Sequence, residues 1–222
     1  MMSQTRGSTA RRIHVGRLSR ERILEAALKI VDREGLEGLS MRRLGSELGV
    51  EAMALYYYFR NKSALLDGLC EKLLADLHLE TDPDRDWSGR LRRALTSFRD
   101  ALRRHPNLVP LMTSRPVLTP AALRATELQY AALRSAGLGP KAVVDAHRTL
   151  GSYVFGYLLV ETQFARSGLN ETSFNPDLSF LTAQDFPATF ELMPYQAASD
   201  WDQQFQIGLD LILAGILARS RS

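Results

Sequence analysis

The chain has 222 residues, 45% of them hydrophobic and 24% charged, which is enough sequence to bury a sizeable core in one or two domains. Its single cysteine, Cys70, excludes an internal disulfide framework and indicates a reducing, cytoplasmic setting. No apolar run has the length of a signal-peptide core or a membrane span, so we expect neither export nor membrane insertion.

The formal net charge of +3 is unevenly distributed along the chain. Residues 1–63 hold 12 Lys and Arg against 7 Asp and Glu, whereas the remainder carries 16 against 18. A basic end on a mildly acidic body indicates a polyanionic partner for the first part, although a solvated basic tail would give the same balance.

The first residues, 1–18, are polar, Arg-rich and aperiodic, and we expect them to form a disordered basic arm. Apolar residues then recur at helical spacing nearly everywhere, and no segment alternates as a strand would, so the predicted fold is all-α. Helices are expected to begin after the capping residues Ser19 and Ser40, and to end at Gly35 and Gly49. The first four predicted helices cover residues 20–34, 41–48, 52–58 and 64–79.

Two short helices separated by a glycine turn, and packed on a preceding helix, indicate a helix-turn-helix. Gly49 allows a left-handed backbone after the second helix, and the small Gly45 suits a close crossing of the second and third helices. The side chains predicted to face inward are Leu44, Leu48, Val50, Leu55 and Phe59. Those predicted to face outward from the third helix are Glu51, Ala52, Met53, Tyr56 and Tyr57, while Tyr58 is expected to be partly buried.

This outward face suits a DNA duplex better than water, because it holds tyrosines and few charges. Tyrosine hydroxyls donate to phosphates, and alanine and methionine side chains meet thymine methyl groups in the major groove. We expect Arg42 to reach a base edge or a phosphate, and Lys62, at the start of the fourth helix, to hold a phosphate. Arg43 is a further candidate, although a solvated side chain is an equal alternative. A protein–protein surface is the alternative for the tyrosines.

The run ILEAALKIVDREGLEGLSMRRLGSELGVEAMALYYYFRNKSALLDGL resembles the DNA-binding region of the TetR (tetracycline repressor) family, most specifically in LGV, LYYYF and NKSALL. The resemblance implies a three-helix head joined by its fourth helix to a larger helical ligand-binding and dimerisation domain. It also implies a transcriptional regulator, usually a repressor that a small molecule releases from its operator. The positions that match the family's DNA contacts are Arg42, Glu51, Ala52, Met53, Tyr56, Tyr57 and Lys62. Ala52 departs from the tetracycline repressor itself, which carries a base-reading glutamine there.

The DNA-binding domain is expected to span residues 19–66, and the ligand-binding and dimerisation domain residues 67–222. The polar stretch at residues 81–86 reads as a linker. Residues 168–200 hold three prolines and predict a long loop, with one helix near residues 186–192. The other predicted helices cover residues 87–104, 108–113, 120–136, 140–166 and 201–219.

A weaker resemblance to the tetracycline repressor subgroup continues into this second region. It places His78, Phe98 and Gln129 at positions that line the drug pocket of that subgroup. Two departures argue against tetracycline as the ligand. Ala94 stands where the subgroup has a drug-contacting asparagine, and Leu111 stands at about the place of the histidine that coordinates the drug's magnesium. An alkyl chain does not replace an imidazole ligand.

We therefore expect a more apolar effector than tetracycline, no required cofactor and no metal site. The candidate ligand-binding residues are His78, Phe98, Leu111, Met112, Arg115, Gln129 and Tyr153, for each of which ordinary core packing is the alternative. The four histidines are too scattered along the chain for a metal site, and His105 and His147 are assigned structural or surface roles.

The last two long helices are the predicted dimer helices, because small residues permit close approach there. Gly151, Gly156, Gly208 and Gly215 are these small residues, and Leu209, Ile212, Leu213 and Ile216 are expected to be buried in a four-helix bundle of two subunits. A purely internal core is the alternative. A dimer would hold two heads about 34–36 Å apart on a palindromic operator.

The predicted function is a homodimeric, DNA-binding transcriptional regulator whose partners are an operator duplex, a second copy and a small-molecule effector. An activator or a ligand-independent regulator with the same head is the first alternative. A helical enzyme is the second, but the sequence shows no nucleophile–base pair, metal-ligand spacing or phosphate loop. An architectural DNA-distorting protein is the third.

Overall fold

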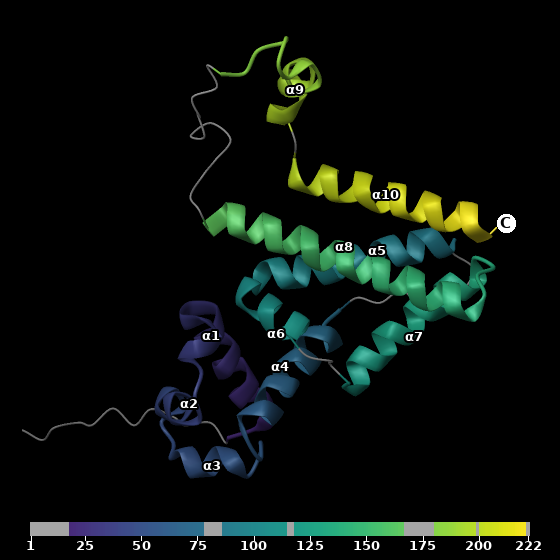
Figure 1. The fold of residues 1–222 in the computed structure, drawn as a ribbon. Helices are drawn as coiled ribbons and strands as arrows, with labels where there is room; N and C mark the ends of the chain where they lie inside the picture. Colours follow the sequence, from purple (N-terminus) through teal and green to yellow (C-terminus); the bar gives the residue numbers. More distant parts are fainter. Residues whose placement is uncertain (1–17, 78–85, 115–117, 167–179, 199, 221–222) are drawn as a thin grey trace, which may run out of the picture. The chain divides into compact units, whose positions relative to one another are not determined.

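The structure is a computed structural model that describes residues 18–77, 86–114, 118–166, 180–198 and 200–220. The predicted arm, apart from Leu18, and the predicted linker, apart from Asp86, lie outside these residues. Every regular element in the described ranges is a helix, which confirms the all-α prediction (Figure 1). The fold divides after Leu65 into a first unit, here called the head, and a second unit, here called the body.

The head is built from three helices and the start of a fourth: α1 (Arg20–Gly38), α2 (Met41–Leu48), α3 (Ala52–Tyr56) and α4 (Lys62–Ala75). Two predicted caps form, because Ser19 Oγ accepts a hydrogen bond from Arg22 N at 3.2 Å and Ser40 Oγ accepts one from Arg43 N at 3.1 Å. Inside α1, Gly35 adopts φ 74° and ψ 178°, so the regular helix breaks where the sequence predicts.

The helix-turn-helix geometry depends on two glycines. Gly49 lies at φ 68° and ψ 33°, the left-handed conformation that ends α2. Gly45 lies where α2 crosses the start of α3, and a Cβ there would stand 2.8 Å from the Val50 carbonyl oxygen and 3.2 Å from Ala52 N. Leu44, Leu48, Leu55 and Phe59 are buried around this crossing, as predicted, which leaves the other side of α3 uncovered.

Helix α4 crosses the division between the head and the body, and the body continues through α10. Helices α5, α7 and α8 pack on one another, and α10 runs alongside α8 (Figure 1). No helix of the described ranges is both long and apolar enough to cross a membrane. The remaining elements are α5 (Trp87–Arg104), η1 (Pro106–Leu108), α6 (Val109–Ser114), α7 (Pro120–Ser135), α8 (Pro140–Arg166), α9 (Pro187–Leu192), η2 (Met193–Ala198) and α10 (Trp201–Ser220).

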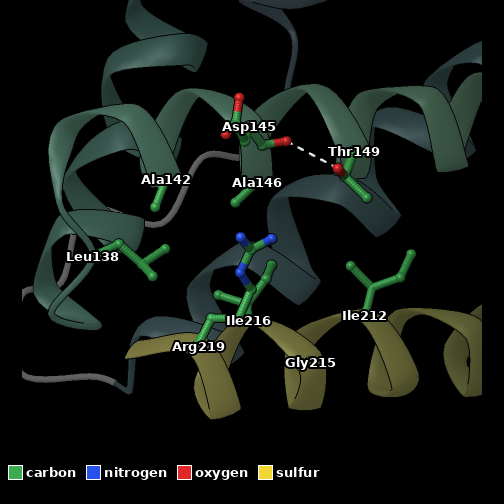
Figure 2. A pocket seen from close by; sticks show the side chains of 9 residues that line it. All are labelled: Leu138, Ala142, Asp145, Ala146, Thr149, Ile212, Gly215, Ile216 and Arg219. Carbon is green, nitrogen blue, oxygen red and sulfur yellow. Dashed lines mark hydrogen bonds between the residues drawn. The ribbon is translucent and has the colours of Figure 1, made fainter. Parts of the chain in front are cut away.

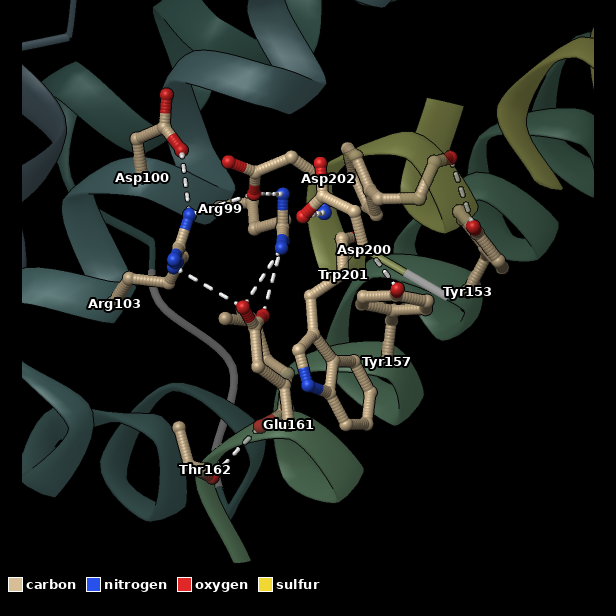
Figure 3. A network of polar contacts seen from close by, with 12 residues as sticks. Arg99, Asp100, Arg103, Tyr153, Tyr157, Glu161, Thr162, Asp200, Trp201 and Asp202 are labelled. Carbon is tan, nitrogen blue, oxygen red and sulfur yellow. Dashed lines mark hydrogen bonds and ion pairs between the residues drawn. The ribbon is translucent and has the colours of Figure 1, made fainter. Parts of the chain in front are cut away.

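A buried ionic network ties α5, α8 and α10 together (Figure 3). Arg99 is only 1% exposed and donates to both carboxylate oxygens of Glu161, at 2.7 and 3.0 Å, and to Asp202 at 2.8 Å. Arg103 pairs with the same two carboxylates, at 3.1 and 2.7 Å. Burial raises the pKa of Tyr157 to about 12, so its hydroxyl stays protonated and donates to the Trp201 carbonyl at 2.6 Å. These contacts fix the start of α10 against the body.

Candidate functional site: a DNA-binding face and a ligand cavity

The uncovered side of α3 presents large side chains to solvent. Tyr57 is 88% exposed, Met53 76% and Tyr56 42%, whereas Leu55, on the opposite side of the same helix, is fully buried. Exposing such large, mostly apolar side chains to water is unfavourable, whereas a DNA duplex offers them phosphates, sugars and thymine methyl groups as contacts. The predicted orientation of Tyr56 and Tyr57 is the one that the structure shows.

Tyr58 behaves differently from its two neighbours and forms part of the frame that holds α3. Its hydroxyl donates to the Leu18 carbonyl at 2.7 Å, and its own carbonyl accepts from Arg20 Nη1 at 3.0 Å. The guanidinium of Arg20 also lies 4.2 Å from the centre of the Phe59 ring. These contacts tie the start of α1 to the end of α3, which fits the predicted partial burial of Tyr58.

Two cations flank the α3 face. Arg42 is exposed and makes no hydrogen bond or ion pair within the part of the chain that the structure describes. Lys62 is exposed and donates one long hydrogen bond, 3.4 Å, to the Leu36 carbonyl, which leaves two of its three N–H groups for another acceptor. Two further predicted DNA-contact residues lie between these cations in the sequence. Glu51 is exposed and Ala52 is half-buried.

Arg43, the remaining DNA-contact candidate, is engaged within the protein. Its guanidinium donates to Glu34 and to Glu47, both at 2.8 Å, and Arg33 pairs with the same two carboxylates. Hydrogen bonds from Arg43 and Arg33 lower the pKa of Glu34. This cluster links α1 to α2 and pairs the Arg43 guanidinium within the head, and a contact of Arg43 with DNA stays a prediction.

The body encloses a cavity of about 300 Å³ between α4, α5, α6, α7 and α8. Three predicted ligand-binding residues, Phe98, Met112 and Gln129, line it, as does Ala94. The other lining residues were not predicted to bind a ligand, and most of them recur at helical spacing along one face each of α7 and α8. They are Leu74, Leu77, Leu95, Ala122, Ala125, Thr126, His147, Gly151, Val154 and Phe155.

The structure places two other predicted ligand-binding residues away from the cavity and does not describe the remaining two. Leu111 is buried but does not line the cavity. Tyr153 packs its ring on Phe205, with centroids 5.4 Å apart, and donates to the Phe205 carbonyl at 2.9 Å, so it belongs to the contact between α8 and α10. His78 and Arg115 lie outside the described residues. His147, predicted to be structural or at the surface, lines the cavity instead.

A groove between α8 and α10, of about 290 Å³, marks the predicted dimer helices (Figure 2). It is lined by small and aliphatic side chains, by Thr149, and by Asp145 and Arg219. Lys141, which donates a hydrogen bond at 2.6 Å, lowers the pKa of Asp145, and the nearby charges of Arg148 and Arg219 add to the shift.

The residues predicted to fill a bundle between subunits are placed differently. Leu209, Leu213 and Ile216 are buried within the single chain, because α10 packs them against the body. A second apolar set on the same two helices is exposed instead. It consists of Leu159 and Val160 on α8 and of Ile207, Leu211 and Leu217 on α10, here called the apolar face.

The head and the body together define a class of protein: a helix-turn-helix regulator with a separate helical ligand-binding domain. The family model for bacterial regulatory proteins of the tetR family matches residues 23–69, and the model for the tetracyclin repressor-like C-terminal domain matches residues 80–220. The chain therefore belongs to the TetR family. Members of this family are DNA-binding transcriptional repressors that a small-molecule ligand releases, not enzymes, and this chain is one of these regulators.

Individual relatives agree with this assignment. The chain is 34% identical to the HTH-type transcriptional repressor DrrR1 of Streptomyces coeruleorubidus over 209 residues, which is 90% of this chain and 77% of the relative. It is 32% identical to the tetracycline repressor class C of Escherichia coli over 212 residues, 91% of this chain and 92% of the relative. The crystal structure of ActR from Streptomyces coelicolor in complex with actinorhodin superposes with a TM-score of 0.80, at 29% identity, covering 90% of this chain and 96% of that one.

Proposed function

We propose that the α3 face, Arg42 and Lys62 are the surface with which this regulator binds its operator. The observation that supports this most strongly is the exposure of Tyr57 and Met53 on a helix whose other side is buried. Lys62 and the tyrosine hydroxyls bind phosphates, which supplies affinity without sequence information. Arg42 and the apolar side chains of α3 contact base edges, which supplies sequence preference.

Selection of bound fragments from the source genome, followed by binding measurements on the enriched duplex, tests this assignment. We expect a palindromic consensus. Arg42→Ala should weaken binding by about 1–3 kcal/mol and relax sequence preference, and Lys62→Ala should reduce the salt slope by about 1. Lys29→Ala removes one exposed cation from the middle of α1 and is the matched control. Equal losses in all three variants would show that only net charge matters and would contradict the assignment.

The cavity is proposed as the effector site, and α4 as the helix that transmits its occupancy. Leu74, in the last turn of α4, and Leu77, just after that helix, line the cavity, and α4 begins at Lys62 of the proposed DNA-binding surface. One turn before Leu74, Glu71 accepts hydrogen bonds from Ala121 N with both carboxylate oxygens, at 2.9 and 3.2 Å. Glu71 thus binds the first turn of α7, which forms another wall of the cavity. An effector that prefers the released state would move α4 through these contacts and lower the affinity for DNA.

The apolar face of α8 and α10 is the proposed dimer interface. TetR-family regulators dimerise, and the exposed aliphatic side chains of these helices have no other cover among the described residues. Two copies joined there would present two heads to the halves of a palindrome. Because the operator lies on the chromosome, we place the regulator in the cytoplasm.

A further inference from the structure

Polar side chains line only one side of the cavity in the body. Helices α4, α5 and α6 contribute only apolar side chains, among them Leu74, Phe98 and Met112. All the polar side chains, namely Thr126, Gln129 and His147, come from α7 and α8, which pack on each other. Among the described residues, no Lys, Arg, Asp or Glu lines the cavity. A molecule inside therefore meets one polar side and an otherwise apolar surface.

None of the three polar side chains has a hydrogen-bond partner among the residues that the structure describes. The side chains of Thr126 and Gln129 are half-buried and make no hydrogen bond there, and His147 Nδ1 is buried and unpaired. Buried polar atoms are almost always paired in folded proteins, and leaving one unpaired costs about 1–3 kcal/mol. His147 Nδ1 is one such atom, and two further polar side chains without a described partner line the same cavity, which indicates that their partners belong to a bound molecule.

The hydrogen-bonding character of this polar side is mixed. Burial, together with the charge of Arg148, lowers the pKa of His147, so its imidazole is neutral at pH 7 and offers one donor and one acceptor. The Gln129 amide and the Thr126 hydroxyl also both donate and accept. Hydroxyl groups match this set, because each of them can donate and accept in turn.

Charged molecules do not fit the cavity. A carboxylate, sulfonate or ammonium group would lose its hydration and find no opposite charge on the wall, which is the costliest kind of burial. The aromatic rings of Phe98 and Phe155 lie edge to face, with centroids 5.6 Å apart, and give flat rings a surface to pack on.

We propose that the effector is an uncharged, mostly apolar ring compound that carries hydroxyl groups along one edge, and that Thr126, Gln129 and His147 select it by binding that edge. The proposal rests on the cavity being the effector site. A volume of about 300 Å³ lies at the low end of the roughly 300–1,000 Å³ that ligand cavities occupy, which restricts the compound to a few rings. Gln129 and His147 are specificity-determining residues in this account.

Four naphthalene probes test the proposal by calorimetric titration of the full chain at pH 7. The 2,7-dihydroxy compound has both hydroxyls on one edge, and the 2,6-dihydroxy isomer has them on opposite edges. Unsubstituted naphthalene lacks the hydroxyls, and naphthalene-2-sulfonate replaces them with a charge. We expect the 2,7 isomer to bind about tenfold tighter than naphthalene, the 2,6 isomer to lie between them, and the sulfonate to bind most weakly.

Gln129→Leu keeps the side-chain volume and should remove most of the preference for the 2,7 isomer while naphthalene still binds. Gln163→Leu, at an exposed position of α8, is the matched control and should leave the preference unchanged. The proposal is overturned if no probe binds, if the sulfonate binds best, if the two isomers bind equally, or if Gln129→Leu keeps the wild-type preference. Salt-dependent binding of the wild-type protein to DNA is measured separately, so that failure of this ligand class is distinguishable from failure of the proposed regulatory function.

Discussion

Gly45→Ala perturbs the crossing of α2 and α3, on which the proposed DNA-binding face depends. The new Cβ would stand 2.8 Å from the Val50 carbonyl oxygen and 3.2 and 3.3 Å from the backbone N and Cα of Ala52. These neighbours are backbone atoms at the turn and at the first residue of α3, so no side-chain rotation relieves the overlap. The two helices have to separate, and α3 has to shift.

Two opposing effects set the magnitude. Alanine is a better helix former than glycine by about 1 kcal/mol in a helix interior. Overpacking a tight contact costs about 1–3 kcal/mol. Because the overlap involves backbone on a second helix, we expect overpacking to prevail and the head to lose about 1–2 kcal/mol of stability. A shift of α3 also displaces Met53 and Tyr57, so the affinity for the operator should fall about tenfold or more.

Native-state hydrogen exchange of the α2 and α3 amides measures the stability of the head, and fluorescence anisotropy with the selected duplex measures its affinity. Ser46→Ala changes the next, exposed residue of α2 and should stay within about 0.5 kcal/mol of wild type. If Gly45→Ala raised protection by about 1 kcal/mol and left DNA affinity unchanged, helix propensity alone would govern this position and the close crossing would not exist.

Three further substitutions probe other parts of the structure. Arg99→Met leaves the buried Glu161 with only its Arg103 contact, so chemical denaturation should show a loss of about 3 kcal/mol, and the double variant Arg99→Met/Glu161→Leu should recover part of it. No recovery in the double variant would mean that charge pairing is not the cause. Glu71→Ala removes both acceptors from the first turn of α7 and should lower thermal stability by about 0.5–2 kcal/mol, with Glu71→Gln less affected; equal stability of all three proteins would exclude the contact. Leu211→Glu puts a charge at a 71% exposed position of the apolar face and should give folded monomers in analytical ultracentrifugation, whereas an unchanged dimer would move the interface elsewhere.

Local signals made the head predictable from sequence. Ser40 and Gly49 bound α2 at its observed ends, because a cap and a left-handed glycine each act within one turn. The outward position of Tyr57 could be predicted because the 3.6-residue period of a helix separates it from the inward-facing Leu55. The ion pairs of Arg43 could not be predicted, because its partner Glu34 comes from another helix and the sequence does not show which arginine faces it.

The body was less predictable, because long helices that are apolar on several sides do not reveal which side packs inside the chain. On α10, Leu209 and Leu213 are buried while Leu211, between them, is exposed. Tyr153 faces α10 rather than the cavity for the same reason. The cavity role of His147 had one sequence signal, its spacing of four, seven and eight residues from Gly151, Val154 and Phe155, but that pattern is also typical of ordinary core packing.

Affinity of Tyr57→Ala for the selected operator duplex tests the central claim most directly. Tyr57 is 88% exposed, and its side chain makes no hydrogen bond within the described ranges and touches only the edge-to-face ring of Tyr58, so its truncation should change the stability of the fold by no more than about 0.5 kcal/mol. If α3 lies on DNA, anisotropy titration should show binding about tenfold weaker, with the same circular dichroism spectrum and melting temperature as wild type. Unchanged affinity for the duplex would place the DNA contact on another surface and contradict the account.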